Sequence, residues 1–309
     1  MNNILLTGAS GFIGNALIKN QNQNIHRVVL RNAKGVDSEN VIVVDEINGD
    51  TNWVGAFDQV DSIIHLAGLA HNKSFTESDY RAVNTEGTLR LALMAAEAGV
   101  RRFVFVSSIG VNGTVTHSRP FLPSDTANPH NFYAQSKYEA ELGLWDIAKK
   151  TGLEVVIVRP TLVYGANAPG NFGLLTKLIE NFPLLPFGLT RNRRNFISVQ
   201  NLTNLLATCA SHKNAAGHIF LASESETVSI KEFTNAIASG LGKKVYQISV
   251  PVSFLRYAGK LVGKSAMVEQ LVGDFQVDSS DLKTVLDWSP PYTMKESMAF
   301  LKKQSIERE

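Results

Sequence analysis

The sequence has little cysteine, little net charge and no long apolar run, and each shortage excludes a class of protein. Cys209 is the single cysteine among 309 residues, so no disulfide can form within the chain. Its apolar helical surroundings predict a small core residue in a protein of a reducing cytoplasm. The 30 basic and 28 acidic residues leave a net charge of +2 without a long basic run. That balance gives no electrostatic case for nucleic acid or for an anionic membrane surface.

Membrane spans, secretion signals and metal sites are also missing from the pattern. No stretch approaches the ~18 consecutive apolar residues of a membrane span. The first apolar residues are those of the first predicted strand, so we expect no secretory signal there. The seven histidines show no i, i+3 or i, i+4 pairing and have no cysteine cluster beside them, so we expect no metal site.

A glycine-rich turn near the start of the chain points to a bound dinucleotide. Gly8, Gly11 and Gly14 follow the apolar run Ile4–Leu6 directly, in the spacing G-x-x-G-x-x-G. Such a turn lets the backbone approach a pyrophosphate, and the helix that follows points its N–H groups at the anion. A turn of this kind can also be purely structural, but its place after an N-terminal strand favours the cofactor. The predicted cofactor residues are Gly8, Ser10, Gly11, Phe12, Ile13 and Gly14.

A tyrosine and a lysine form the second candidate group. Of the seven tyrosines only Tyr133 has a lysine four residues later, Lys137, and this spacing places both side chains on one helix face. Lowering a phenol pKa from near 10 by roughly three units requires about 4 kcal/mol, which a nearby ammonium and a positive nicotinamide ring could supply. An isolated pair of this kind is usually an incidental surface pair. The glycine turn upstream favours a catalytic one.

Ser108 is the third candidate. It follows the apolar strand Phe103–Val106, and a hydroxyl at the carboxyl end of a parallel strand opens onto the crevice where ligands bind. There it can hydrogen-bond a reacting oxygen. The alternative is that the serines at 107 and 108 merely terminate a strand.

The order of apolar patterns predicts an α/β fold, a doubly wound parallel sheet of the Rossmann type. The predicted strands cover 3–7, 27–31, 41–44, 61–67, 102–107 and 153–159, and the predicted helices cover 13–20, 78–98 and 133–151. Beyond Gly165 prolines and glycines interrupt the pattern around a short helix at 172–181. We expect a dinucleotide-binding domain over 1–168, to which 198–225 return, and a substrate lobe formed by 169–197 and 226–309.

Five motifs in order make the chain resemble the extended short-chain dehydrogenase/reductases, and among them the NAD-dependent epimerase/dehydratase group that acts on nucleotide sugars. Two are the glycine turn and the Tyr133–Lys137 pair. The others are Ile63–Gly68 (IIHLAG), Asn84–Leu89 (NTEGTL) and Val158–Gly165 (VRPTLVYG), which are similar to the family's H-L-A-G, N-x-x-G-T-x and R-P-x-x-V-Y-G segments. The resemblance covers nearly the whole chain.

The resemblance implies roles for individual residues. Tyr133 would be the acid/base, Lys137 the ribose ligand and phenolate stabiliser, and Ser108 their hydroxyl partner. The further cofactor contacts it implies are Glu46, Ile47, Leu66, Ala67, Gly68 and Pro160.

For the nucleotide sugar the resemblance implies Asn171 and Arg194. The alternative for Arg191, Arg193 and Arg194 is a solvated basic loop. We favour a diphosphate contact for Arg194, because the residues after it return to an apolar-periodic helix and a guanidinium suits phosphate oxygens.

The chain departs from the family where the second strand ends. NAD-using members place an acidic residue there, whereas this strand ends in Arg31-Asn32. Arg31 could contact a 2′-phosphate, which favours NADP over NAD. The alternative is a surface arginine in a site that relies on other contacts.

The function that follows is a nucleotide-sugar 4-epimerase acting on UDP-hexoses or UDP-N-acetylhexosamines by hydride transfer at C4 through bound NAD or NADP. An NADPH-dependent 4-keto-sugar reductase is the alternative, since it uses the same three residues. A dehydratase usually has Asp-Glu after the serine, where this chain has Ile109-Gly110. A non-catalytic dinucleotide-binding regulator would not need the three catalytic groups. Dimers are common in the family, so a homodimer is the expected assembly.

The segment 252–272 is amphipathic. A partner helix or a membrane-surface contact would explain that pattern, and a cover for the sugar pocket is the interpretation we prefer.

Overall fold

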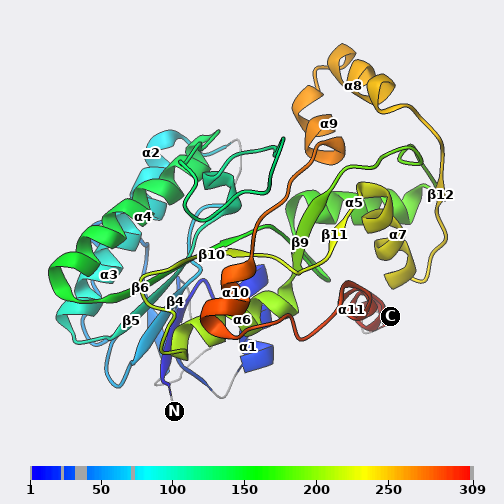
Figure 1. Ribbon diagram of the computed structural model, residues 1–309. Helices are drawn as coiled ribbons and strands as arrows, with labels where there is room; N and C mark the ends of the chain where they lie inside the picture. The colour runs from blue at the N-terminus through cyan, green and yellow to red at the C-terminus, as the bar shows by residue number, and fades with distance from the viewer. Residues whose placement is uncertain (1, 22–23, 32–39, 71–73, 307–309) are drawn as a thin grey trace.

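A seven-stranded sheet forms one half of the molecule (Figure 1). The computed structural model describes residues 2–21, 24–31, 40–70 and 74–306. Every pairing in this sheet is parallel and the order is β10-β6-β5-β4-β1-β2-β3, which confirms the predicted doubly wound fold. The strands are β1 (Ile4–Thr7), β2 (Ile25–Leu30), β3 (Val41–Val43), β4 (Ser62–His65), β5 (Arg102–Val106), β6 (Glu154–Pro160) and β10 (Ile219–Ala222).

Helices cover both faces of this sheet, which explains why its strands are almost continuously apolar. Alternate side chains of β1 enter opposite cores: Ile4 and Leu6 pack in one, and Leu5 in the other. The first core lies beneath α1 (Phe12–Gln21) and α6 (Val199–Ser211), which pack side by side. The second lies beneath α3 (Gly87–Glu97) and α4 (Phe132–Thr151).

The helix predicted over 78–98 has three parts. α2 (Glu77–Tyr80) leads into a π-helical turn, Arg81–Glu86, and α3 follows. Periodicity alone does not distinguish an α from a π turn here, because the π turn covers only six residues, which is too short for its own repeat to show. π turns often mark functional sites, and this one places Asn84 in the candidate site described below.

The second half of the molecule is built on two small sheets. β7 (Leu162–Tyr164), β9 (Arg194–Ser198) and β11 (Thr227–Val228) form the first, and β8 (Leu184–Leu185) and β12 (Tyr246–Gln247) form the second. The helices of this half and of the connections to it are η3 (Ile109–Val111), α5 (Gly170–Asn181), α7 (Ile230–Gly240), α8 (Val252–Leu261), α9 (Ser265–Val272), α10 (Ser280–Leu286) and α11 (Met294–Ile306).

Segments distant in sequence return to the large sheet. α6 packs on α1, and β10 adds the edge strand beside β6. Leu282, Leu286 and Trp288 also join the core beneath α1 and α6. The exact division into two domains stays a prediction.

Cys209 lies on α6, fully buried in that same core, so its predicted place is confirmed. Burial raises the pKa of its thiol to about 12, with Arg102 acting in the opposite direction. None of the helices in the described part of the chain is both long enough and apolar enough to cross a membrane.

Candidate active site

The glycine turn connects β1 to α1 through very close backbone packing. Gly8 has a φ of +71°, and its carbonyl accepts from the Gly11 N–H at 3.0 Å. A Cβ at Gly14 would collide with the Gly8 oxygen and lie 2.7 Å from the Ala9 Cα. The first turn of α1 therefore sits directly against the end of β1, where its unpaired N–H groups suit a phosphate.

The second wall of this cradle follows β4. A Cβ at Gly8 would lie 2.7 Å from the Ala67 nitrogen, and one at Gly68 would lie 2.7 Å from the Asn84 Oδ1 and 3.4 Å from the Lys137 Nζ. Asn84 accepts from the Leu69 N–H at 2.7 Å and donates to the Ser136 hydroxyl at 3.1 Å. The π turn thus ties this wall to α4.

The buried His65 connects the glycine turn after β1 to the second wall, which follows β4. The Thr88 hydroxyl donates to the Asn84 carbonyl at 2.7 Å, so it accepts from the His65 Nε2 at 2.9 Å. The His65 Nδ1 then accepts from the Thr7 hydroxyl at 2.7 Å. Burial, and secondarily the charge of Lys137, lowers the pKa of His65 to about 3. A neutral imidazole in one tautomer therefore joins β1, β4 and α3.

Tyr133, Lys137 and Ser108 converge at the carboxyl ends of β5 and β6. Asn131 caps α4 by accepting from the Ala134 N–H at 2.8 Å, which fixes the first turn that carries Tyr133. The Lys137 ammonium donates to the Val106 carbonyl at 3.1 Å. A side-chain hydrogen bond joins Tyr133 to Ser108. The sequence predicted these three positions, and the fold brings them together.

The pKa directions describe what this group can do. Burial raises the pKa of Tyr133 above its ordinary 10, the Ser108 hydrogen bond opposes that, and Tyr80 adds to it. Burial lowers the pKa of Lys137 from 10.5 to about 8, with Glu141 opposing. Tyr133 alone is therefore a proton donor at neutral pH, and only added positive charge would make it a base.

The buried ion pair of Glu141 and Arg159, which lies next to Lys137, was not predicted from the sequence. Glu141 is one turn beyond Lys137 on α4, and it accepts from the Arg159 Nε at 2.9 Å and from the Ser107 hydroxyl at 2.5 Å. Arg159 also donates to the Asn112 Oδ1 at 2.9 Å. The four-residue step from Tyr133 to Lys137 to Glu141 was a signal that could have found it.

A cavity of about 450 Å³ opens beside Ser108 and contains both predicted substrate residues, Asn171 and Arg194. Pro160 lines it as well, from the end of β6. Much of the remaining wall is apolar and includes Leu174, Leu175, Leu178, Met267, Leu271 and Phe275. The cavity thus combines one cation and a few polar groups with an apolar wall, which is typical of ligand sites.

Arg194 differs from its two neighbours. Arg191 and Arg193 are exposed, whereas Arg194 is 9% exposed and its guanidinium lies 5.3 Å from the centre of the Phe275 ring. It donates to the Gly273 carbonyl at 2.9 Å, and burial lowers its pKa to about 10, with Asp274 opposing. Arg194 begins β9, and the predicted helix follows that strand as α6 from Val199. The buried strand holds the guanidinium in the cavity wall.

The predicted adenosine end of the site is less constrained. Arg31 follows β2 and is exposed, and its neighbour Asn32 lies outside the described residues. Glu46 is exposed after β3, and its carboxylate accepts from the Asn48 amide at 3.3 Å. Ile47 is buried against Gly87, where a Cβ would lie 2.9 Å from its Cγ2. Contacts of Arg31, Glu46 and Ile47 with a cofactor stay predictions.

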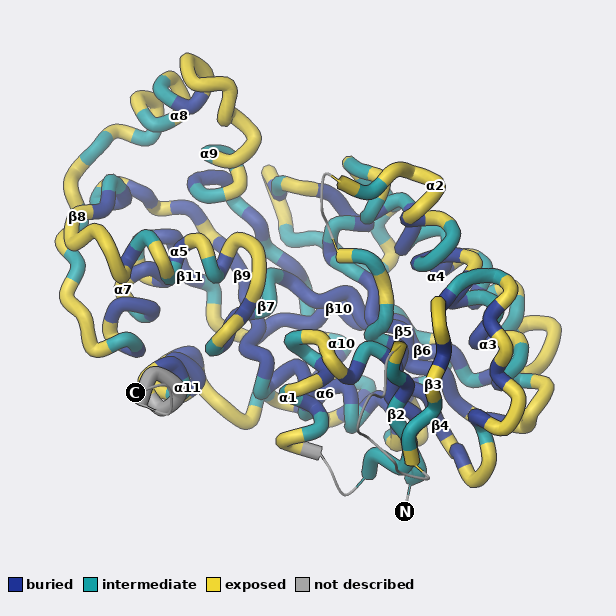
Figure 2. Tube along the Cα trace, turned by 180° about the vertical axis from the view of Figure 1, so that it is seen from behind, coloured by how far each residue is buried: buried dark blue, intermediate teal, exposed yellow. Residues whose placement is uncertain are grey.

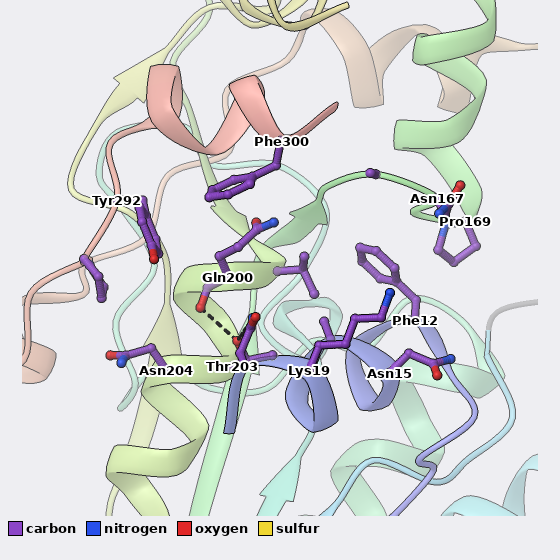
Figure 3. Close-up of a pocket in the computed structure, with 15 residues that line it drawn as sticks. Phe12, Asn15, Lys19, Asn167, Pro169, Gln200, Thr203, Asn204, Tyr292 and Phe300 are labelled. Atoms are coloured by element: carbon purple, nitrogen blue, oxygen red, sulfur yellow. Dashed lines mark hydrogen bonds between the residues drawn. The ribbon is translucent and has the colours of Figure 1, made fainter. Parts of the chain in front are cut away.

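A larger hollow of about 1100 Å³ lies away from this group, between α1, α6 and α11 (Figure 3). Of the predicted site residues only Phe12 lines it. Its wall carries exposed Asn15 and Lys19 from α1 and Gln200 from α6. Ser108, Tyr133 and Lys137 do not line this hollow, so it is not the predicted active site.

Comparisons with known proteins agree with the geometry. A family model described as the NAD dependent epimerase/dehydratase family matches residues 4–222. A UDP-glucose 4-epimerase of Vibrio cholerae is 40% identical over 302 residues, which is 95% of this chain and 92% of that protein. An N-acetyl-alpha-D-glucosaminyl-diphospho-ditrans,octacis-undecaprenol 4-epimerase of Escherichia coli O157:H7 is 25% identical over 319 residues, with 96% of this chain and 93% of that protein covered.

Among solved structures, the UDP-N-acetylglucosamine 4-epimerase from Bacillus cereus superposes with a TM-score of 0.79 at 18% identity. The superposition covers 98% of this chain and 99% of that one. At this identity the likeness shows the shared fold alone.

Proposed function

The chain belongs to the NAD-dependent epimerase/dehydratase family, and from this membership we propose that it is a nucleotide-sugar 4-epimerase acting on UDP-hexoses or UDP-N-acetylhexosamines. One observation carries the proposal. Ser108, Tyr133 and Lys137 meet between the glycine turn and the cavity that contains Asn171 and Arg194. The relative at 40% identity supports the choice of C4 and of a UDP-sugar.

The residues of the cradle fit a dinucleotide. Gly8 and Gly14, where a side chain would collide with backbone, allow the tight turn and the packing of α1 on β1, and the exposed Gly11 between them is where a pyrophosphate can approach the backbone. The turn from Gly8 to Gly14 would hold the diphosphate, and Lys137 beside Gly68 would hold the nearer ribose. The bound nicotinamide ring would supply the reversible acceptor for the hydrogen on sugar C4.

The chain's own groups move the proton. Tyr133 takes the proton of the C4 hydroxyl as that carbon becomes a ketone, and later returns it to the same oxygen. Ser108, whose hydroxyl already forms a hydrogen bond with the phenol, donates a hydrogen bond to the C4 oxygen. The ammonium of Lys137 stabilises the phenolate that exists before the first transfer and again after the second. The cavity wall formed by Leu174, Leu175 and Leu178 has few fixed polar contacts, so the keto sugar can turn and present its other face.

The reaction itself is the first test. Purified protein without added cofactor is expected to carry bound NAD and to convert UDP-glucose or UDP-N-acetylglucosamine into the C4 epimer, measured by proton NMR and by absorbance. Stoichiometric consumption of NADPH with a 4-keto sugar, and no inversion of any UDP-hexose, would instead establish the reductase. Cofactor binding without either reaction would support the remaining alternative, a non-catalytic dinucleotide-binding regulator.

The second test concerns NAD against NADP. The family is NAD-dependent by description, and we propose that Arg31 nevertheless allows this chain to accept a 2′-phosphate. Arg31→Asp should then weaken NADPH binding more than NADH binding, because it replaces attraction with repulsion at that one group. Fluorescence titration of both cofactors measures this. Arg101→Asp, at the opposite end of the sheet, is the matched control, and equal losses for both cofactors would remove Arg31 as the discriminator.

The third test concerns the diphosphate of the substrate. Arg194→Ala should raise the KM for the UDP-sugar on the order of tenfold to a hundredfold, because a charge-assisted hydrogen bond is worth about 1.5–3 kcal/mol. Arg193→Ala, exposed and adjacent, is the matched control. Arg194→Ala also removes the hydrogen bond to the Gly273 carbonyl. The melting temperatures of both variants show whether that loss destabilises the fold, so a change in KM at an unchanged melting temperature reports substrate binding. An unchanged KM would assign Arg194 to structure alone.

We also propose a homodimer in the cytoplasm. The proposed assembly rests on the family, in which dimers are common. The proposed localisation rests on the single free thiol of Cys209. The light-scattering measurement described below reports the assembly directly.

A further inference from the structure

The helix α8 projects from the end of the second half of the molecule (Figure 1). Figure 2 shows the same projection from behind, with much of its tube exposed. Phe254 and Tyr257 are each 60% exposed, Leu261 is 69% exposed, and Val262, directly after the helix, is 68% exposed. Three of these recur at steps of three and four residues, so Phe254, Tyr257 and Leu261 share one face of the helix.

The opposite face of α8 already has its partners. Leu255 packs against the core of this half, and Gly259 is buried where a Cβ would lie 2.5 Å from a methyl of Val268 on α9. Arg256 pairs with Glu269 of α9 at 2.9 Å. The fold of the α8–α9 pair therefore does not need the outer stripe of Phe254, Tyr257 and Leu261.

The sugar cavity does not need that stripe either. α9 lines the cavity through Met267, Gln270 and Leu271, as the preferred interpretation of segment 252–272 expected, but no α8 residue is among the lining residues. Of the 17 large apolar side chains found exposed in the described residues, 11 lie between Leu174 and Met267. The exposure is thus concentrated on this half of the molecule.

The charges around the stripe are positive. Segment 252–272 contains three basic residues and one acidic residue, Glu269. That carboxylate is engaged by Arg256, which leaves Lys260 and Lys264 exposed beside the stripe with no acidic neighbour in the segment. The near-neutral charge of the whole chain conceals this local excess.

We propose that α8 is a membrane-surface helix that docks on anionic lipid headgroups. Aromatic and aliphatic side chains on one face, flanked by lysines, match the interface between headgroups and acyl chains. A stable protein–protein contact buries about 800 Å² on each partner, whereas a convex helix of 10 residues presents a single narrow stripe. A bilayer accommodates such a ridge. This inference does not depend on the proposed reaction.

Vesicle binding tests the proposal with the full-length protein. The wild type should co-sediment with vesicles of phosphatidylcholine and phosphatidylglycerol. Vesicles of phosphatidylcholine alone should bind it at least tenfold more weakly. The double variant Phe254→Ser with Leu261→Ser should lose at least tenfold in partition coefficient, since both side chains lie on the exposed face. Lys260→Glu with Lys264→Glu should lose the preference for the anionic lipid.

Two control pairs match these changes on the other half of the molecule. Val43→Ser with Val54→Ser removes two apolar side chains that are 55% and 83% exposed, and Lys149→Glu with Lys150→Glu reverses two exposed charges. Both should bind vesicles like the wild type. All variants should keep wild-type turnover of a soluble UDP-sugar, so failure of the proposed reaction and failure of docking are read separately.

Three outcomes would overturn the proposal. The first is no sedimentation of the wild type with anionic vesicles. The second is a dimer that light scattering, without vesicles, shows to dissociate in the Phe254→Ser, Leu261→Ser variant, because the stripe would then be a contact between two copies. The third is a loss of soluble turnover in that variant with vesicle binding intact, which would make α8 a cover of the cavity.

Discussion

Tyr133→Phe should lower the turnover of the UDP-sugar by a factor on the order of 10²–10⁴, the range that general acid–base catalysis usually contributes. The change removes the hydroxyl that exchanges the proton and keeps the ring that packs against Tyr80 at 6.1 Å. Cofactor content and melting temperature should therefore stay close to those of the wild type. Steady-state assays, with absorbance of the purified protein, measure all three quantities.

Tyr138→Phe is the matched control, because Tyr138 is on the same helix, half-buried, and one residue past Lys137. It should turn over at the wild-type rate. Near-normal turnover in Tyr133→Phe would remove this phenol from the mechanism. A loss of bound cofactor in the same variant would give the ring a binding role and leave its proton-transfer role unproven.

The sequence was sufficient to predict the sheet and to find the residues that the fold brings together in the candidate active site, for a physical reason. Strands that are buried on both faces have continuous apolar sequences, such as Phe103–Val106. Residues on one helix face recur at a fixed spacing, as Tyr133 and Lys137 do. Both signals are local. The parallel arrangement then brings the ends of separate strands to one edge, so Ser108 joins the pair without any further information.

The contacts that hold this group in place depend on residues far apart in the chain. Which hydroxyl meets His65 depends on the approach of α3 to β4, and the partner of Glu141 is 18 residues away on another element. Their residue types are not distinctive: a histidine in a strand and a glutamate on a helix are common on their own. The outward face of α8 was visible as an amphipathic pattern, but only the fold shows which apolar face is already covered.

The buried pair of Glu141 and Arg159 should give the largest stability effect. Glu141→Ala would leave the guanidinium of Arg159 buried without its carboxylate, a change that costs about 3–5 kcal/mol. Domains of this kind are stable by only about 5–15 kcal/mol, so a large drop in the urea midpoint is expected. Urea unfolding followed by circular dichroism measures it.

Glu141→Gln separates the charge of this group from its packing. The negative charge of Glu141 raises the pKa of Lys137, which burial has lowered to about 8. The ammonium form of Lys137 is present below that pH and is lost above it, so removing the charge should move the alkaline decline of kcat/KM to lower pH. Glu139→Gln, on the same helix but paired with Arg81 near the surface, is the matched control. If the two glutamine variants gave the same pH profile, Glu141 would support the fold of the site without setting the protonation of its lysine.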